Sequence, residues 1–401
     1  MIEIKMYPAK NGDCFLLSFG ISKKNHILID CGYVDTYERF LKKDLLDIAK
    51  KKEKINLMII THIDADHISG AIKFIQDNDN EKFIEIEEVW FNAYRHLQTH
   101  KENGTELHIK ETEILEREIA LGKSYFKRVN QSEIVTDEIS AKQGSTLGAL
   151  LLKGNYNWNT KFNGNAVSTN INESISIEGV SITILSPDEQ KLKKLESKWI
   201  KELKKKKWNF YINENKLFDD AYEFMLLLGE NEYIVTSNEI SKQKTKESLN
   251  VEGFIEKEYE MDHGDINGSS IAILIEYDEK KLLFLADAHP DIISNKLIKM
   301  GKTKFDLVKV SHHGSIKNTN NELAKVMNSN RYLFSTNGHK HRHPDSQTII
   351  KLLFANSQSE KQLYFNYETD TSKLFESKEL QQKYNYETIT GNGEEPIVIE
   401  L

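Results

Sequence analysis

The hydrophobic pattern of the chain changes abruptly after residue 60. Residues 55–60 form a short, almost continuous apolar run, which is typical of a buried strand. Beyond residue 67, four apolar residues recur at helical spacing: Ile68, Ala71, Ile72 and Ile75. We therefore expect a helix from about Ser69 to about Asn78. The polar residues 61–67 are predicted to form the tight turn that joins this strand to the helix.

Short strands and helices alternate elsewhere too. In the first 90 residues the pattern predicts strands at 2–6, 15–19, 26–29 and 89–91 and a helix over 37–51. In the second half it predicts strands at 270–277, 281–285, 307–310, 331–335 and 396–401, with helices over 321–327 and 346–354. This alternation favours an α/β sandwich.

Two stretches interrupt the alternation. The first, about 93–172, predicts helices over 110–122 and 132–153 followed by an Asn- and Gly-rich loop, and a strand is expected at 174–185. The second, about 190–261, is helical to Lys207 and then aromatic and polar. We interpret residues 1–401 as one domain with two largely helical insertions. Its core covers about 1–92, 173–190 and 262–401, and the insertions cover about 93–172 and 190–261.

Composition narrows the class of protein. A chain of 401 residues that is 39% hydrophobic can bury a substantial core. No apolar run approaches the ~20 residues that span a bilayer, and the first residues lack a signal-peptide pattern. We therefore expect a soluble, cytoplasmic protein without a membrane partner. Cys14 and Cys31 lie in predicted strands, where buried free thiols are favoured over a disulfide.

Charge is unevenly distributed along the chain. A net charge of −8 argues against a wholly basic nucleic-acid-binding surface. Residues 191–207 nevertheless carry nine lysines against two glutamates. Such a run usually forms a solvated helix face, and the alternative is a local binding surface for a polyanion.

The predicted turn at 61–67 holds four potential metal ligands: His62, Asp64, Asp66 and His67. An isolated His or Asp in a loop is usually a solvated turn residue. Two imidazoles and two carboxylates at this spacing suit a divalent metal of borderline softness, such as Zn²⁺ or Mn²⁺. The sequence therefore predicts a metal site at this strand–helix junction.

This turn resembles the metal-binding signature His-x-His-x-Asp-His of the metallo-β-lactamase fold superfamily. Its His-x-Asp-x-Asp-His form is similar to the branch that contains the hydrolase domain of the bacterial competence DNA-uptake protein ComEC. Further segments fit that branch in order: Gly12-Asp13, Asp30-Cys31-Gly32, Ser186-Pro187-Asp188, Asn267-Gly268-Ser269-Ser270, Leu285-Ala286-Asp287, Ser311-His312-His313-Gly314-Ser315 and His343-Pro344. The resemblance implies an αββα sandwich.

The resemblance also implies metal ligands. It makes Asp287 a bridge between two ions and His343 the final ligand, while one of His312 and His313 faces the metals. The expected ligands are His62, Asp64, Asp66, His67, Asp287, His313 and His343, and the expected catalytic residues are Asp66, His312 and His313. The sequence departs from the family at Asp64, which replaces a histidine, and no histidine matches the third motif.

Four further residues are expected beside the ligands or at the substrate. Asp13 could orient a ligand histidine, although Gly-Asp is often simply a turn, and Asp30 has the same turn-capping alternative. Asn267 lies in the segment that resembles the Asn-x-x-Ser motif of the family. Lys309 and Lys317 flank the histidine pair and could neutralise a substrate phosphate, or be surface lysines.

The function expected from these residues is metal-dependent hydrolysis by a phosphodiesterase or nuclease with two Zn²⁺ or Mn²⁺ ions. The expected substrate is a nucleic acid or another phosphodiester. A lactonase, thioesterase or β-lactamase is the competing enzyme class, because the same metals activate water against a carbonyl. A metal-bearing module of a defence or uptake system, which binds a protein partner through its insertions, is the alternative outside enzymes.

Overall fold

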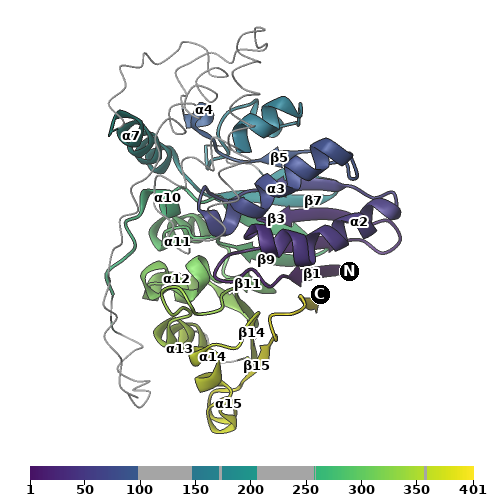
Figure 1. Ribbon diagram of the computed structural model, residues 1–401. Coiled ribbons are helices and arrows are strands. Elements are labelled where there is room, and N and C mark those ends of the chain that lie inside the picture. The colour runs from purple at the N-terminus through teal and green to yellow at the C-terminus, as the bar shows by residue number, and fades with distance from the viewer. Residues whose placement is uncertain (98–146, 171–173, 206–256, 258, 356–358) are drawn as a thin grey trace.

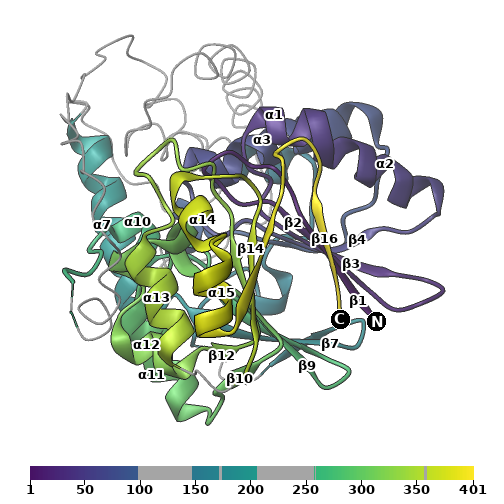
Figure 2. The same cartoon turned by 90° about the horizontal axis from the view of Figure 1, so that it is seen from below.

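The computed structural model describes residues 1–97, 147–170, 174–205, 257, 259–355 and 359–401, with the backbone alone for 199–205. Two sheets face each other and helices cover their outer faces (Figures 1 and 2). The predicted α/β sandwich is confirmed. Most of the two predicted insertions lies outside the described residues, including the helix expected at 110–122 and the segment after Lys207.

The first sheet has six strands and the second has eight. The first runs in the order β16 (Ile397–Glu400), β1 (Ile2–Met6), β2 (Phe15–Phe19), β3 (Asn25–Ile29), β4 (Ile55–Ile59) and β5 (Val89–Trp90). The second runs in the order β15 (Tyr386–Thr390), β14 (Lys361–Phe365), β13 (Arg331–Phe334), β11 (Leu307–Lys309), β9 (Lys280–Phe284), β8 (Ala272–Tyr277), β7 (Val180–Ser186) and β6 (Ile175–Ile177). A small parallel pair, β10 (Lys304–Phe305) and β12 (Asn328–Ser329), stands apart.

Two groups of helices cover opposite faces of the sandwich (Figure 2). Over the first sheet lie α1 (Val34–Thr36), a π-helical turn (Tyr37–Leu41), α2 (Lys42–Lys50) and α3 (Ala65–Glu81). Over the second lie α11 (Pro290–Lys299), α12 (Asn321–Val326), α13 (Ser346–Ala355), α14 (Asp370–Phe375) and α15 (Lys378–Tyr384). None of the helices among the described residues is long and apolar enough to cross a membrane.

Strand β4 shows why the apolar run before the metal-binding turn is continuous. Leu57 and Ile59 pack into the cluster between the two sheets, whereas Met58 and Ile60 pack under the helices of the first sheet. Since both faces of the strand are buried, alternation with polar residues is absent. A third cluster lies between the second sheet and its helices. The turn that follows β4 is thus anchored on a rigid strand.

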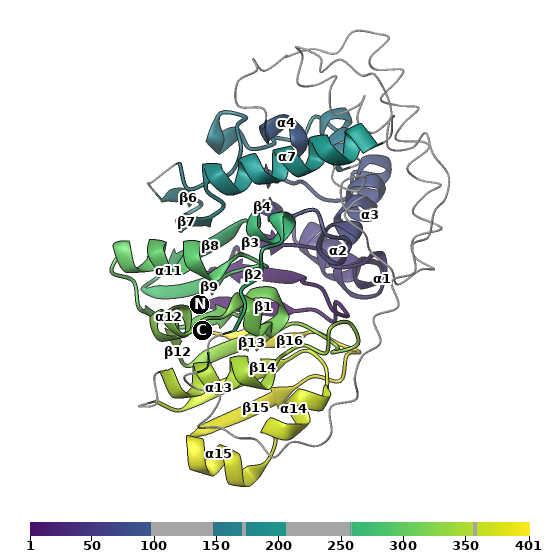
Figure 3. The ribbon, with the colours of Figure 1, turned by 90° about the vertical axis from the view of Figure 1, so that its left-hand side faces the viewer.

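Parts of the predicted insertions pack into the same core. Helix α7 (Glu189–Lys205) lies beside α4 (Tyr94–Leu97) (Figure 3) and beside the short helix α10 (Asp265–Gly268) (Figure 2). Leu192 of α7 and Trp158 join the cluster that α2 and α3 form with the first sheet. Residues 147–153 are helical, within the helix expected at 132–153. Cys14 and Cys31 are buried free thiols, as expected.

Two elements differ from the sequence-based expectations. Helix α3 begins at Ala65 rather than near Ser69, so Asp66 and His67 lie in its first turn. An acidic residue is stabilised there by the helix dipole. The strand expected at 174–185 is a hairpin of β6 and β7, because Glu178 and Gly179 both adopt positive φ angles (48° and 82°), which a two-residue turn requires.

Candidate metal centre

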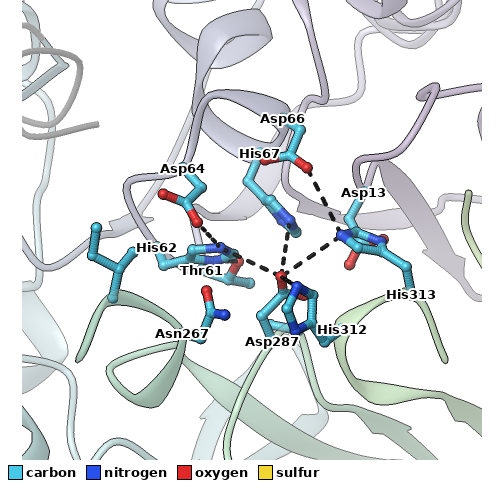
Figure 4. A network of polar contacts seen from close by, with 12 residues as sticks. Asp13, Thr61, His62, Asp64, Asp66, His67, Asn267, Asp287, His312 and His313 are labelled. Carbon is cyan, nitrogen blue, oxygen red and sulfur yellow. Dashed lines mark hydrogen bonds and ion pairs between the residues drawn. The ribbon is translucent and has the colours of Figure 1, made fainter. Parts of the chain in front are cut away.

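The loops that follow β4, β9 and β11 meet at one edge of the sandwich (Figure 4). The first carries His62 and leads into α3, the second carries Asp287, and the third carries His312 and His313. Both members of the histidine pair adopt left-handed backbone conformations, with φ angles of 46° and 55°. Such conformations are strained in non-glycine residues and are concentrated at functional sites. They turn both imidazoles towards Asp287 (Figure 4).

The turn at residues 11–13 packs against the start of α3. The Asp13 amide donates to the Asp66 carbonyl at 3.3 Å, and Asn11 Nδ2 donates to Asp66 Oδ2 at 2.6 Å. A Cβ at Gly12 would lie 1.9 Å from the Asp66 carbonyl oxygen, so only glycine permits this approach. The Gly-Asp turn thereby holds the Asp66 carboxylate in place.

Each of four histidines donates its Nδ1 proton away from Asp287. His67 donates to Asp30 at 2.8 Å, and His313 donates to the Ser335 carbonyl at 2.8 Å. The Thr61 hydroxyl donates its only proton to Asp30. It must therefore accept the hydrogen bond from His62 Nδ1, which lies 3.0 Å from Thr61 Oγ1. With Nδ1 protonated, the Nε2 atoms of His62, His67 and His313 are unprotonated and each carries a free lone pair.

The fourth histidine, His312, has the same tautomer. Its Nδ1 atom lies 2.9 Å from Asn318 Oδ1, and the Asn318 amide group donates to the Asp287 carbonyl and to Asp262. Because those two bonds fix the orientation of the amide, Oδ1 of Asn318 accepts the His312 proton. The Nε2 atom of His312 is then also unprotonated and carries a lone pair.

The four lone pairs converge on one oxygen of Asp287. Its Oδ2 atom lies 3.6 Å from Nε2 of His312 and of His313, and 3.8 Å from Nε2 of His62 and of His67. Among the described residues, no hydrogen-bond partner reaches Nε2 of His62, His67 or His313, although all three atoms are buried. Burying acceptors without a donor is costly, and a bound cation removes that cost. The residues present therefore fit a metal centre.

The carboxylates divide the centre into two sides. Asp64 Oδ2 lies 3.7 Å from Nε2 of His62, and Asp66 Oδ2 lies 3.9 Å from Nε2 of His313. Groups whose ligand atoms all lie within 4.8 Å of one another include His62, His67 and Asp287 on one side and Asp66, His67 and His313 on the other. His67 belongs to both groups, so the arrangement offers overlapping sets of ligands for a divalent cation.

Burial controls protonation in the metal-free centre. Loss of solvation lowers the pKa of His62 to about 4 and that of His313 to about 3, and it lowers the pKa of His67 as well. These imidazoles are therefore neutral near pH 7, the form that binds metal. Burial also raises the pKa of Asp66 to about 6.

Lys309 is fully buried within the centre. Its ammonium contacts Asp13 Oδ2, lies 4.0 Å from Oδ1 of Asp287 and donates to the Ala286 carbonyl at 3.3 Å. Burial would raise the pKa of Asp13, but the charges of Lys309 and His313 hold it at about 2. Lys309 is thus neither a surface lysine nor exposed to a substrate phosphate, which corrects both interpretations of it from the sequence. It lies beside the ligands, as does Asp13, whose Oδ1 is 3.4 Å from His313 Nδ1.

Asp30 has a larger role than the turn-capping one considered from the sequence. Its carboxylate accepts from the Thr61 amide at 2.8 Å, from the Thr61 hydroxyl at 2.7 Å and from His67. It therefore orients His67 directly and His62 through Thr61, as carboxylates behind metal-binding histidines do. The signal in the sequence was the position of Asp30 at the end of a strand parallel to β4.

Sequence reasoning missed Asp262 and Asn318. Asp262 accepts from Asn267 at 2.7 Å and from Asn318 at 3.1 Å, and its Oδ2 lies 3.6 Å from His312 Nδ1. Asn267 therefore contacts this network and lies near the ligands (Figure 4). No local pattern distinguishes Asp262 from other acidic residues.

Two expected residues lie further out. His343 belongs to none of the ligand groups found among the described residues; its ring centre lies 5.6 Å from that of His312 and its Nδ1 lies 3.4 Å from Asp345. Lys317 is exposed at the end of the same loop.

The comparison with known protein families agrees with this geometry. No curated protein matches the chain. Residues 7–128 match the model of the metallo-beta-lactamase superfamily, whose members are generally metal-dependent hydrolases that typically bind zinc. The match includes His62, Asp64, Asp66 and His67, whereas Asp287 and the histidine pair lie beyond it. Residues 7–128 are therefore similar to the metallo-beta-lactamase superfamily, and the sandwich that the described residues form is consistent with the fold of that superfamily.

Proposed function

We propose that this protein is a metal-dependent phosphodiesterase or nuclease. The proposal is carried by one observation: four imidazole lone pairs converge on Asp287 Oδ2, and a further carboxylate stands on each side. When bound, two divalent ions supply the positive charge that stabilises the attacking and leaving oxygens of a displacement at phosphorus. The resemblance of the motifs to the ComEC-like branch supports the same substrate class.

The residues of the chain have distinct roles in this proposal. His62, His67, His313 and Asp287 hold the ions, with Asp64 on one side and Asp66 on the other. Asp66, fixed by Asn11, also orients the attacking water. The side chain of His312 is 23% exposed, whereas those of the other three histidines are at most 5% exposed. His312 is therefore the imidazole that a substrate reaches, and it can exchange a proton with the reacting group.

Two features favour a phosphodiester over a carbonyl substrate. Three carboxylates (Asp64, Asp66 and Asp287) make a harder and more anionic centre than a histidine-rich one, which suits Mn²⁺ as well as Zn²⁺. The lysine-rich helix α7 begins close to Asp262, which contacts His312. Lysines beside a reaction centre favour an anionic substrate. A lactonase, thioesterase or β-lactamase remains the second enzyme class.

Metal analysis and substrate profiling test the proposal together. The protein is purified without added metal, loaded with Zn²⁺ or Mn²⁺, and assayed on bis(p-nitrophenyl) phosphate, single-stranded DNA, RNA, a p-nitrophenyl ester and a β-lactam. We expect two ions per chain and cleavage of the phosphodiesters. Cleavage of the ester or β-lactam alone would show that the protein is a hydrolase of carbonyl substrates instead. A loaded but inactive protein would favour a module that binds a partner.

A further inference from the structure

A cavity of about 200 Å³ lies beside the metal centre, between the N-terminal ends of α7 and α11 and the start of α10. Helices α7 and α10 contact each other, and α11 lies next to α10 in Figure 1. The ionisable residues that line the cavity are two lysines, two histidines and three aspartates: Lys191, Lys194, His263, His289, Asp262, Asp265 and Asp291. Because one water needs only about 10–15 Å³ of such volume, the cavity is large enough for a small polyatomic group.

Asp262 lies between this cavity and the metal centre: it lines the cavity, and its Oδ2 is 3.6 Å from His312 Nδ1. Its carboxylate accepts from Asn318, which in turn holds His312 and the carbonyl of Asp287. It also accepts from Asn267 at 2.7 Å and from the Gly264 amide at 2.8 Å. A group in the cavity is therefore separated from the reacting groups by one hydrogen-bonded side chain.

Two lysine ammonium groups, those of Lys191 and Lys194, are cationic hydrogen-bond donors of the cavity. The Lys191 ammonium donates to His289 Nδ1 at 2.8 Å, and Asp291 lies 3.6 Å from it, beyond an ordinary hydrogen bond. Since an ammonium has three N–H groups and the described residues accept one of them, Lys191 can still donate to a ligand. Its side chain is only 14% exposed, which limits competition from water.

Three carboxylates also line the cavity, those of Asp262, Asp265 and Asp291, and the most buried of them, Asp262, is engaged by hydrogen bonds. Asp262 is saturated by three donors, and those hydrogen bonds offset the rise in pKa that its burial would cause, so that its pKa falls. Asp291 is half-exposed and faces Lys191. Lys194 has no ion-pair partner among the residues that the structure describes, and its neighbour Lys193 pairs with Glu189 at 2.6 Å. Lys191 and Lys194 therefore both keep N–H groups that can donate to a ligand, and two ammonium groups side by side can recognise a phosphate oxygen.

We propose that this cavity is a subsite for the phosphate that flanks the scissile diester of an oligonucleotide. This inference rests on the proposed phosphodiesterase function and adds a substrate preference to it: a diester with a second phosphate binds more tightly than an isolated diester. Lys191 forms the buried contact and Lys194 the contact at the mouth of the cavity. Of the lysine-rich run, these two residues are assigned to the substrate.

Matched thymidine substrates isolate the flanking phosphate. Thymidylyl-thymidine has the scissile diester alone, and the same dinucleotide with a 5′- or a 3′-terminal phosphate adds one flanking group. The measured quantity is the ratio of KM without and with the terminal phosphate in each enzyme. We expect a ratio of about ten in the wild type for one of the two ends, because a charge-assisted hydrogen bond contributes that much. Lys191→Met and Lys194→Gln should each lower the ratio to below about three.

Lys193→Gln is the control, since Lys193 lies on the same helix, carries the same charge and does not line the cavity. Its ratio should equal that of the wild type. A wild-type ratio of one, an unchanged ratio in both cavity variants, or an equal loss in Lys193→Gln would overturn the subsite.

A binding measurement separates failure of the subsite from failure of the proposed function. Isothermal titration compares thymidine 3′,5′-bisphosphate with thymidine 5′-monophosphate in the metal-loaded protein. The ratio of their Kd values should fall in Lys191→Met and Lys194→Gln and stay constant in Lys193→Gln, whether or not the dinucleotides are cleaved. Equal Kd values for the two nucleotides in the wild type would contradict the subsite independently of turnover.

Discussion

Replacing Lys309 with methionine removes the buried positive charge from the centre while keeping most of the volume of the side chain. The ammonium is 1% exposed, contacts Asp13 and lies 4.0 Å from Oδ1 of Asp287. In the metal-free protein it is the counter-charge of the Asp13 carboxylate, and it also opposes the rise in pKa that burial causes at Asp287. We expect Lys309→Met to destabilise the metal-free protein strongly and the metal-loaded protein much less.

The magnitude follows from the burial of the charges. Lys309 is in direct contact with the ionised Asp13, and two unit charges about 4 Å apart already interact by about 4 kcal/mol at an effective dielectric constant near 20. Removing one member of a buried ion pair typically costs about 3–5 kcal/mol, because the other charge is left uncompensated. Bound divalent ions bring positive charge to the same Asp287, so they replace part of what the ammonium provided. Metal should therefore stabilise the variant more than it stabilises the wild type.

Urea unfolding in a chelator and in saturating Mn²⁺ measures both effects. The matched control is Lys302→Met, which breaks the ion pair between Lys302 and Glu276 at 2.6 Å, where both side chains are more than a quarter exposed. A surface pair of this kind contributes about 0–1 kcal/mol. A double variant, Lys309→Met with Asp13→Asn, removes both charges and should be more stable than Lys309→Met alone.

Equal losses for Lys309→Met and Lys302→Met in chelator would refute the electrostatic role of Lys309. The same conclusion would follow if Mn²⁺ stabilised Lys309→Met and the wild type by the same amount. In that case the lysine would be a packing residue.

Three further predictions concern the ligands and their supports. Asp30→Asn should weaken metal binding about 10–100-fold in a chelator competition, because His67 loses its orienting carboxylate, whereas Asp77→Asn at the far end of α3 should not. Asp66→Asn and Asp66→Ala should abolish hydrolysis and leave the fold intact. The pKa of Asp66 is raised from 3.8 to about 6, so the metal-free protein loses stability as the pH rises through 6. Asp66→Asn should therefore stabilise the metal-free protein by about 3 kcal/mol at pH 8 and hardly at pH 4. Equal gains in stability at both pH values would contradict this prediction. By elemental analysis, His343→Ala should keep both ions and His313→Ala should lose at least one. Equal loss of metal from the two variants would show that His343 is also a ligand.

Local sequence predicted the elements whose signal is local. Strand β4 and the polar turn after it could be read from residues 55–67, because burial on both faces gives a continuous apolar run. The start of α3 was placed four residues too late, since Asp66 and His67 are polar and do not extend the apolar periodicity. The Glu178-Gly179 turn was missed because its two strands share one apolar pattern.

The sequence did not show which residues orient the metal ligands. Asp30 and His67 are 37 residues apart, and Asp13 lies in the turn before β2 of the first sheet whereas Lys309 ends β11 of the second. Each acidic residue or lysine is locally compatible with a turn or a solvated surface, and only the tertiary fold decides between these environments. Asp262 shows the same limit, since it gains its role from Asn267 and Asn318.

The number of divalent ions bound per chain tests the central claim most directly. Elemental analysis by mass spectrometry after loading with Zn²⁺ or Mn²⁺ and removal of free metal gives this number for the wild type and for Asp287→Ala. Because Asp287 Oδ2 lies between the two ligand groups, we expect two ions in the wild type and loss of both, or nearly both, in the variant. A wild type that binds no ion, or an Asp287→Ala variant that still binds two, would contradict the account.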